Sequence, residues 1–182
     1  MRKILRKSFF ARPTLIVARE LIGKFLVKKT GKREAAVMIT ETEAYDGHKD
    51  RASHASRGET LRNKPMFGEP GRFYVYFVYG MHEMLNIVTG PKGYPAAVLI
   101  RGTVGTAGPG KLTKFLKITR SLNSKVAKPE SGLWFEDRGV KINKKDIRQT
   151  PRVGVAYAGA VWSKKRYRFL LKSKHANKKQ SV

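Results

Sequence analysis

Two short runs, Glu41-Thr42-Glu43-Ala44-Tyr45 and Phe73-Tyr74-Val75-Tyr76-Phe77-Val78-Tyr79-Gly80-Met81, decide how the rest of the chain is organised. Both predict β-strands, in which successive side chains point to opposite faces of a sheet. Glu43 and Tyr45 are therefore expected to share one face of their strand, and Tyr74 and Tyr76 to share one face of theirs. A carboxylate flanked by aromatic rings can hold a flat, cationic ring beside a base or an acid.

Apolar runs around these two stretches predict an antiparallel sheet. Residues 25–27 and 36–45 are expected to form one hairpin around a turn at Gly31, and residues 73–78 and 84–89 to form a second. Further strands are expected at 96–101, 133–135, around 153–157 and at 167–171. One helix is expected between Pro13 and Gly23, and another from Pro109 or Gly110 onward, because apolar residues follow there at helical spacing.

The aromatic run allows two interpretations. It could be an ordinary strand that covers a core, but Phe73, Val75 and Phe77 already supply one apolar face. Tyr79 lies at the turn itself, where a core residue is not expected, and an exposed ring there can act as a wedge between bases. Alternation does not choose between the two nearby carboxylates, and Arg101, at the end of a later strand, could orient either of them.

Between the two runs, periodicity disappears over residues 46–71. A loop of about 25 residues in a compact domain usually has a function. It contains polar side chains suited to ring or hydrogen-bond contacts, namely His48, His54, Arg57, Arg62 and Asn63.

The 182 residues are enough for one domain with a full core, and 41% of them are hydrophobic. The longest apolar run is too short to span a membrane, and charge returns after Met1–Lys7 before a signal-peptide core develops, which predicts a cytoplasmic protein. The absence of cysteine excludes thiol catalysis, disulfides and cysteine-based zinc sites.

Charge is the strongest compositional signal. The chain has 39 basic and 13 acidic residues, a net charge of +26. A folded domain this basic is typical of nucleic-acid binding. The basic residues dominate both ends, and we expect the arm at 1–12 and the lysine-rich tail at 172–182 to be loosely ordered, with Phe9 and Phe10 of the arm packing inward. The acids gather near the centre, which suits a polyanion held at the periphery and chemistry in the middle.

Two motifs point away from metals and nucleotides. The four histidines, His48, His54, His82 and His175, show no H-E-x-x-H spacing, so no catalytic metal and no cofactor is predicted. The segment Gly105–Lys111 has the G-x-x-x-x-G-K spacing of a phosphate loop, but Leu112 follows where Ser or Thr would hold Mg²⁺. Pro109 also lacks an N–H for phosphate, although Lys111 at a helix start remains a candidate for a DNA phosphate.

Many short motifs then occur in the order and spacing of a known family. They are Glu41-Thr42-Glu43-Ala44-Tyr45, Ala52-Ser53-His54-Ala55, Arg57-Gly58, Arg62-Asn63, Met66-Phe67-Gly68, Tyr74-Val75-Tyr76, Tyr79-Gly80-Met81-His82, Asn86, Arg101, Gly108-Pro109-Gly110-Lys111-Leu112 and Arg152-Val153-Gly154-Val155. In these motifs the chain resembles the alkyladenine (3-methyladenine) DNA glycosylases of the mammalian type, over nearly its whole length.

The resemblance implies a single-domain α+β fold, covering 1–182, with a curved antiparallel sheet, flanking helices and a protruding hairpin, similar to the carboxy-terminal domain of formyltransferases. It implies a monomeric, monofunctional enzyme that flips alkylated or deaminated purines out of double-stranded DNA and hydrolyses their N-glycosidic bonds without a cofactor.

By motif position, Glu43 is implied to be the general base for the attacking water, which Arg101 and the carbonyl of Val153 help to hold. The flipped base is enclosed by Tyr45, His54 and Tyr76, Tyr79 intercalates, and Asn86 disfavours the amino group of guanine. Arg57, Arg62 and Lys111 are candidates for contact with the DNA backbone. The sequence departs from the family pattern at Glu83, often aromatic there, and at Tyr157, which replaces a histidine of the mammalian enzyme.

Two other classes compete with this interpretation. A non-catalytic nucleic-acid-binding module could use the tyrosines as a stacking platform, but it gains nothing from a carboxylate that repels phosphate. A metal-dependent nuclease is the second alternative, and activity that survives a chelator would dismiss it.

Overall fold

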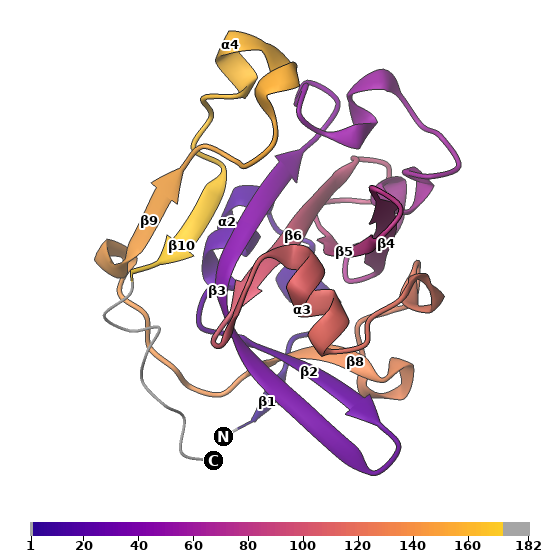
Figure 1. The fold of residues 1–182 in the computed structure, drawn as a ribbon, viewed down its shortest axis with the longest axis vertical. Helices are drawn as coiled ribbons and strands as arrows, with labels where there is room; N and C mark the ends of the chain where they lie inside the picture. Colours follow the sequence, from indigo (N-terminus) through magenta and orange to yellow (C-terminus); the bar gives the residue numbers. More distant parts are fainter. Residues whose placement is uncertain (1, 173–182) are drawn as a thin grey trace.

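A long strand, β3 (Arg33–Asp46), runs through the centre of an antiparallel sheet in the computed structural model, which describes residues 2–172 (Figure 1). The strand order along the sheet is β1-β8-β2-β3-β6-β5-β4. The bounds of these neighbours are β1 Lys3–Ile4, β2 Phe25–Thr30, β4 Phe73–Val78, β5 His82–Val88, β6 Ala96–Thr103 and β8 Leu133–Asp137.

The partners of β3 change along its length. Its first half pairs with β2, and its second half pairs with β6 on one side and with β10 (Arg168–Leu171) on the other. The register between β3 and β6 shifts on both sides of Glu41. Such irregularities bend a strand and increase its twist, which accounts for the curvature of the sheet. Short strands complete it, β7 (Thr106–Ala107) on β6 and β9 (Ile147–Thr150) on β10.

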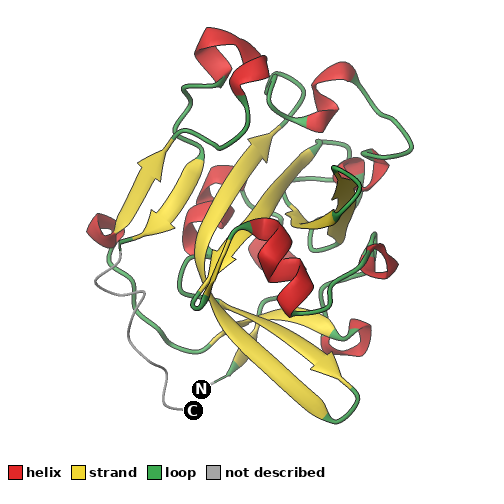
Figure 2. Cartoon of the chain, viewed as in Figure 1, coloured by secondary structure: helices red, strands yellow, loops and turns green. Residues whose placement is uncertain are grey.

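Helices flank the sheet on both faces (Figure 2). The helix α2 (Thr14–Glu20) lies behind β3 in Figure 1, and the buried hydroxyl of Thr42 donates to the carbonyl of Ala18 at 2.8 Å. The helix α3 (Pro109–Phe115) lies in front, against β5 and β6. Because neighbouring residues on a strand face opposite ways, Glu43 points away from α2. Two further helices are one turn long, α1 (Lys7–Phe10) and α4 (Gly159–Trp162).

The main core lies between α2 and the strands β2, β3 and β8, where Phe10, Leu26, Ile39 and Phe135 are fully buried. A smaller cluster, formed by Ala55, Met66, Tyr74, Val88 and Ala97, fixes the long loop against the sheet. In that loop the chain forms two 3₁₀ turns, η1 (His54–Arg57) and η2 (Lys64–Phe67). Further 3₁₀ turns are η3 (Arg120–Leu122), η4 (Pro129–Ser131), η5 (Lys144–Asp146) and η6 (Ala156–Ala158).

This architecture confirms the predicted α+β fold with a curved antiparallel sheet and flanking helices. Two local expectations are wrong. Residues 2–12 are not a loose arm, because β1 pairs with β8. The expected inward packing of Phe10 is confirmed, since its ring lies in the core. Residues 153–157 are not a strand, since Gly154 has a φ of +73° and a 3₁₀ turn begins at Ala156, while the actual strand β9 precedes them. The tail at 173–182, with His175, lies outside the described residues.

Candidate active site

A cavity of about 380 Å³ opens on the α3 face of the sheet. Its wall is formed by β3, β4, β5 and β6, by the start of α3 and by the segment 153–157. It brings together eight of the residues expected from the sequence, which are Glu43, Tyr45, His54, Tyr76, Tyr79, Asn86, Arg101 and Val153. Their elements lie far apart in the sequence, so folding alone assembles this group.

The Glu43 carboxylate borders this cavity but has 0% solvent exposure. Its Oε1 accepts a hydrogen bond from the backbone N–H of Val153 at 2.9 Å, and its Oε2 accepts one from the Tyr45 hydroxyl at 3.0 Å. The Tyr45 contact confirms that these two side chains share a strand face. The Val153 contact uses the amide of that residue and not the carbonyl named in the sequence analysis, whose contact with a water stays a prediction.

Burial raises the pKa of Glu43 above its ordinary value of 4.5, because desolvation penalises the charged form. The Arg101 guanidinium and the two hydrogen bonds act in the opposite direction, and the negative charge of Glu41 raises the pKa further. A carboxylate with a raised pKa is a stronger base than an exposed one, because its pKa lies closer to neutral pH.

Arg101 lies between the two carboxylates of β3. Its Nε is 2.7 Å from Oε1 of Glu41 and 3.5 Å from Oε1 of Glu43. Oε1 of Glu41 also accepts a hydrogen bond at 2.6 Å from the Nε–H of Arg168, on the neighbouring strand β10. Glu41 is therefore held by two arginines at short distances, whereas Glu43 shares one arginine at a longer distance. This asymmetry separates two residues that strand alternation could not distinguish.

A buried ion pair fixes the segment that carries Val153. Arg152 and Asp50 form a bidentate pair at 2.5 and 2.8 Å, and both side chains have 0% exposure. Arg152 also donates to the carbonyl of Ala44, in β3, at 2.8 Å, and its guanidinium lies 4.8 Å from the centre of the Tyr45 ring. The pair thus ties the 152–155 segment to β3 and supports both donors to Glu43. This pairing could not be predicted from sequence patterns, since the partners are 102 positions apart.

Aromatic rings form the opposite wall of the cavity. The ring of His54 contacts that of Tyr76 edge-on, with centroids 4.6 Å apart, and its Nδ1 is 3.0 Å from the Tyr74 hydroxyl. Burial, with a smaller contribution from Arg62, lowers the pKa of His54, which favours the neutral imidazole. Asn63 holds the loop in place by donating to the carbonyl of His54 at 2.9 Å. Burial raises the pKa of Tyr74 to about 12, so these phenols stay protonated.

Asn86 is buried at the floor of the cavity. Its amide donates to the carbonyls of Tyr74 and Met84 at 3.1 and 3.3 Å. These bonds are the backbone contacts that a purely structural role requires, and they also prevent the side chain from turning aside. The rest of the lining is mainly apolar, from Ala52, Met66, Met84, Leu99 and Val155, none of which the sequence singled out as cavity residues.

The tip of the β4–β5 hairpin stands at the mouth of the cavity. Tyr79 is 89% exposed and Met81 is 68% exposed. The N–H of Met81 donates to the carbonyl of Val78 at 3.1 Å, and both central residues of this turn have positive φ, +53° at Tyr79 and +66° at Gly80. These are the φ signs of a type I′ hairpin turn, which suits the twist of the strands but strains a residue other than glycine.

The three residues expected to contact the DNA backbone lie outside this cavity. Arg62 donates to the carbonyl of Phe77 at 2.8 Å and lies over the Tyr76 ring, so it braces the aromatic wall. Arg57 borders a neighbouring depression with Tyr157, and Lys111 is exposed on α3. Of the two departures from the family pattern, Tyr157 lines the cavity and donates to the carbonyl of Ala52, whereas Glu83 pairs with Arg120 at 3.1 Å.

The described part of the chain has neither a metal-binding cluster nor a membrane-spanning helix. Over residues 2–172, no three histidine or acidic side chains gather closely enough to hold a metal ion. In the same range, no helix combines the length and the apolar content that a membrane crossing needs.

Comparison with known proteins agrees with this geometry. A family model described as Methylpurine-DNA glycosylase matches residues 8–105 and 103–175. A relative from Methanocella arvoryzae, named "Putative 3-methyladenine DNA glycosylase", is 44% identical, and the match covers 86% of each chain. Relatives with the same name from Anaeromyxobacter dehalogenans and Myxococcus xanthus are 43% and 40% identical, over 92% and 96% of this chain and 82% and 93% of theirs.

Proposed function

The chain belongs to the methylpurine-DNA glycosylase family, and we propose that it removes alkylated or deaminated purines from double-stranded DNA with Glu43 as its general base. Membership identifies it as a DNA-3-methyladenine glycosylase, a hydrolase of base-excision repair. The observation that carries the mechanism is the buried Glu43 carboxylate with its raised pKa, facing a cavity walled by aromatic rings.

The damaged base has to leave the duplex before it can reach Glu43, because atoms inside the base stack are inaccessible. We propose that it enters the cavity between Tyr45, Tyr76 and His54. Purines alkylated on the ring carry positive charge, which favours contact with the faces of electron-rich rings. A neutral His54 adds no repulsion to such a cation, in keeping with its lowered pKa.

In the chemical step, the bond between the purine nitrogen and C1′ of the sugar breaks, and its electron pair leaves with the base. A water oxygen forms the new bond to C1′ while Glu43 accepts the water proton, and the carboxylate also stabilises the oxocarbenium character of the transition state. A cationic purine thereby leaves as a neutral molecule. Arg101 and the Val153 carbonyl are proposed to hold the water. The Tyr45 hydroxyl already donates to Oε2 of Glu43, and the remaining lone pairs of the carboxylate are free to accept the water proton.

Tyr79 is proposed to fill the gap that the flipped base leaves. Its ring is 89% exposed on a turn at the mouth of the cavity, where a wedge must stand. Arg57, Arg62 and Lys111 are proposed to contact phosphates on either side, where contacts position the protein without reading sequence. Arg62 also holds Phe77 and Tyr76, so this contact would link the backbone to the wall of the cavity.

Asn86 is proposed to exclude guanine. Because its amide is fixed by two backbone carbonyls, the side chain cannot turn away from a bulkier purine edge. The exocyclic amine of guanine would then meet a rigid group at the floor of the cavity, whereas adenine carries no substituent at that ring position.

The decisive experiment incubates the protein with duplexes that each contain one lesion, followed by alkaline cleavage at abasic sites. We expect strand breaks at alkylated purines, with the free base released, in the presence of a chelator. Binding without release of a base would favour the non-catalytic module, and chelator-sensitive breaks at undamaged sites would favour a nuclease. Sedimentation of the free protein tests the predicted monomer.

A further inference from the structure

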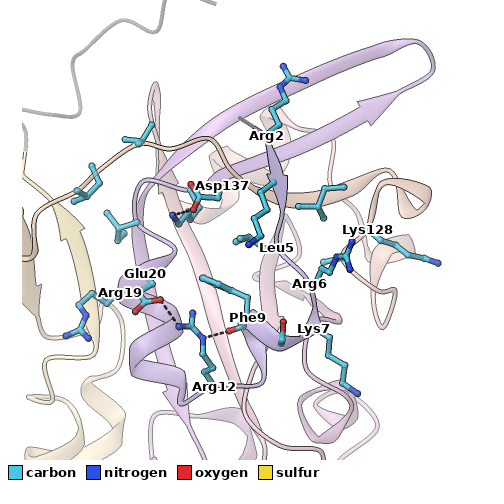
Figure 3. Close-up of a pocket in the computed structure, with 18 of the residues that line it drawn as sticks. Arg2, Leu5, Arg6, Lys7, Phe9, Arg12, Arg19, Glu20, Lys128 and Asp137 are labelled. Atoms are coloured by element: carbon cyan, nitrogen blue, oxygen red, sulfur yellow. Dashed lines mark hydrogen bonds and ion pairs between the residues drawn. The ribbon is translucent and has the colours of Figure 1, made fainter.

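A second, larger hollow lies on the other face of the sheet. It has a volume of about 1370 Å³ and shares no lining residue with the cavity of the candidate active site (Figure 3). Its walls come from residues 2–12, from the end of α2 with Arg19 and Glu20, and from the segments 126–130 and 137–147. Since α2 covers the Thr42 face of β3 and Glu43 points the opposite way, this groove and the active-site cavity open in different directions.

The groove is densely basic. Ten of the residues that line it are lysine or arginine and three are acidic. Two of these acids are paired within the groove, Glu20 with Arg12 at 2.8 Å and Asp137 with Lys24 at 2.6 Å. Over residues 2–172, six of the basic side chains that line it form no ion pair, namely Lys3, Arg6, Arg19, Lys128, Lys141 and Lys144. The groove therefore keeps an excess of uncompensated positive charge.

The backbone next to Arg6 is held in place by the sheet. The strand β1 pairs with β8, and the N–H of Leu5 donates to the carbonyl of Phe135 at 2.9 Å just before Arg6. Arg6 and Lys128 both line the groove, although their segments lie far apart in sequence (Figure 3). A hollow with several unpaired cations along its walls is suited to a polyanion.

The lining also indicates which polyanion fits. Phe9 is the one aromatic residue among those that line the groove. The Arg12 guanidinium lies over the face of its ring, 4.4 Å from the ring centre, and Phe10 makes an edge contact with it. Single strands are bound by stacking their bases on free aromatic rings, which this groove lacks. In duplex DNA the faces of the bases are stacked on one another and the phosphates lie on the outside, so cations without stacking rings are suited to a duplex.

We propose that this groove binds the phosphate backbone of a second DNA duplex while the active-site face holds the first. One protein molecule would then bridge two DNA segments and could move between them without dissociating into solution. The groove needs no lesion, because phosphate contacts carry no sequence information.

The test mixes undamaged donor-labelled and acceptor-labelled duplexes with the protein and follows energy transfer between them. The groove variant combines Arg6→Glu, Lys128→Glu and Lys141→Glu, all exposed positions. The matched control combines Lys29→Glu, Lys32→Glu and Arg33→Glu, which change the same charge on the exposed end of the β2–β3 hairpin, away from both hollows. Thermal melting checks that each variant is folded, and sedimentation counts proteins and duplexes in the bridged complex.

We expect the parent and the control to bridge two duplexes with one protein, and the groove variant to lose bridging at least tenfold. For the second duplex, the slope of log affinity against log salt should fall by about 0.9 for each phosphate contact removed. Single-turnover excision should be unchanged in the groove variant, which separates this proposal from that for Glu43. Equal bridging by the groove variant and the parent, equal loss in both variants, or two proteins in each bridge would overturn the proposal.

Discussion

The two ends of the active-site cavity are built in opposite ways. At the Glu43 end, the carboxylate is completely buried and its neighbours are fixed by an ion pair that is itself fully buried. At the hairpin end, Tyr79 is 89% exposed and is held by a single tight turn. Under the proposed mechanism, proton transfer would depend on geometry set by folding, whereas insertion into DNA would depend on a ring that stays free to meet the duplex.

The largest effect should come from breaking the support of the buried end. Asp50→Asn leaves Arg152 charged and unpaired in the interior, which should destabilise the fold by about 3–5 kcal/mol. The midpoint of urea unfolding measures this loss. Glu20→Gln is the control, since it breaks a pair whose members are 37% and 43% exposed and should cost about 0–1 kcal/mol. Equal costs for both would mean that Asp50 does not hold the site.

Glu43→Gln should abolish the chemistry and leave the structure intact. The variant keeps the size of the side chain but cannot accept the water proton, so single-turnover excision should fall on the order of 10²-fold or more. Binding of lesion DNA should be equal or tighter. The comparison variant is Glu41→Gln, which removes the carboxylate paired with Arg101 and Arg168 and should lower stability more than rate. If Glu41→Gln alone stopped excision, the base would have to be reassigned.

At the exposed end, Tyr79→Ala should weaken base flipping by about 1–3 kcal/mol, the stacking contribution of one ring. The melting temperature should hardly change, because the ring buries little surface. A fluorescent base analogue beside the lesion reports the flipped population. A large loss of thermal stability with unchanged flipping would show that this residue belongs to the structure of the hairpin and not to the DNA contact.

The pH dependence of the free energy of unfolding should reveal the cost of burying the Glu43 carboxylate. The folded-state pKa of Glu43 is raised by burial, so above 4.5 the folded chain holds a proton that the unfolded chain has lost. This group therefore makes the parent less stable as pH rises through that window. Relative to the parent, Glu43→Gln should gain stability from pH 4 to pH 7, as followed by unfolding at each pH. A constant difference would indicate an unshifted carboxylate.

The smallest effect is expected at Asn86, which lies between the two ends. Asn86→Ser removes the rigid amide, so guanine lesions should be excised faster relative to adenine lesions. The ratio of single-turnover rates on the two substrates measures this change, and comparison with the parent cancels any general loss of activity. An unchanged ratio would leave Asn86 with its backbone hydrogen bonds as its only role.

Strand alternation predicted much of this arrangement. It placed Glu43 beside Tyr45, and the aromatic run beside a turn at Tyr79, because both conclusions depend only on neighbours in sequence. Apolar runs bounded by turn residues predicted most strands of the sheet and the hairpin around Gly31, and apolar residues at helical spacing predicted the helices that begin after Pro13 and at Pro109.

Long-range partners were beyond the reach of sequence patterns. Arg152 and Asp50 look like surface residues in sequence, and only folding shows that they pair in the interior. The segment at 153–157 was predicted as a strand from its apolar residues, but the backbone at Gly154 turns instead. Basic residues near the start suggested a loose arm, although Leu5 and Phe10 anchor it in the core. Charge hides such anchors because cations dominate the composition.

The pairing of β10 with β3 has a consequence for how the protein is made. Residues 168–170 lie directly beside residues 41–43, and the Val153 amide that holds Glu43 also comes late in the chain. A ribosome has to synthesise most of the described chain before this edge of β3 is covered. Until then the strand presents unpaired N–H and C=O groups, which are prone to wrong pairing. The edge of β3 that carries Glu43 should therefore be complete only after residues 153–171 have been synthesised.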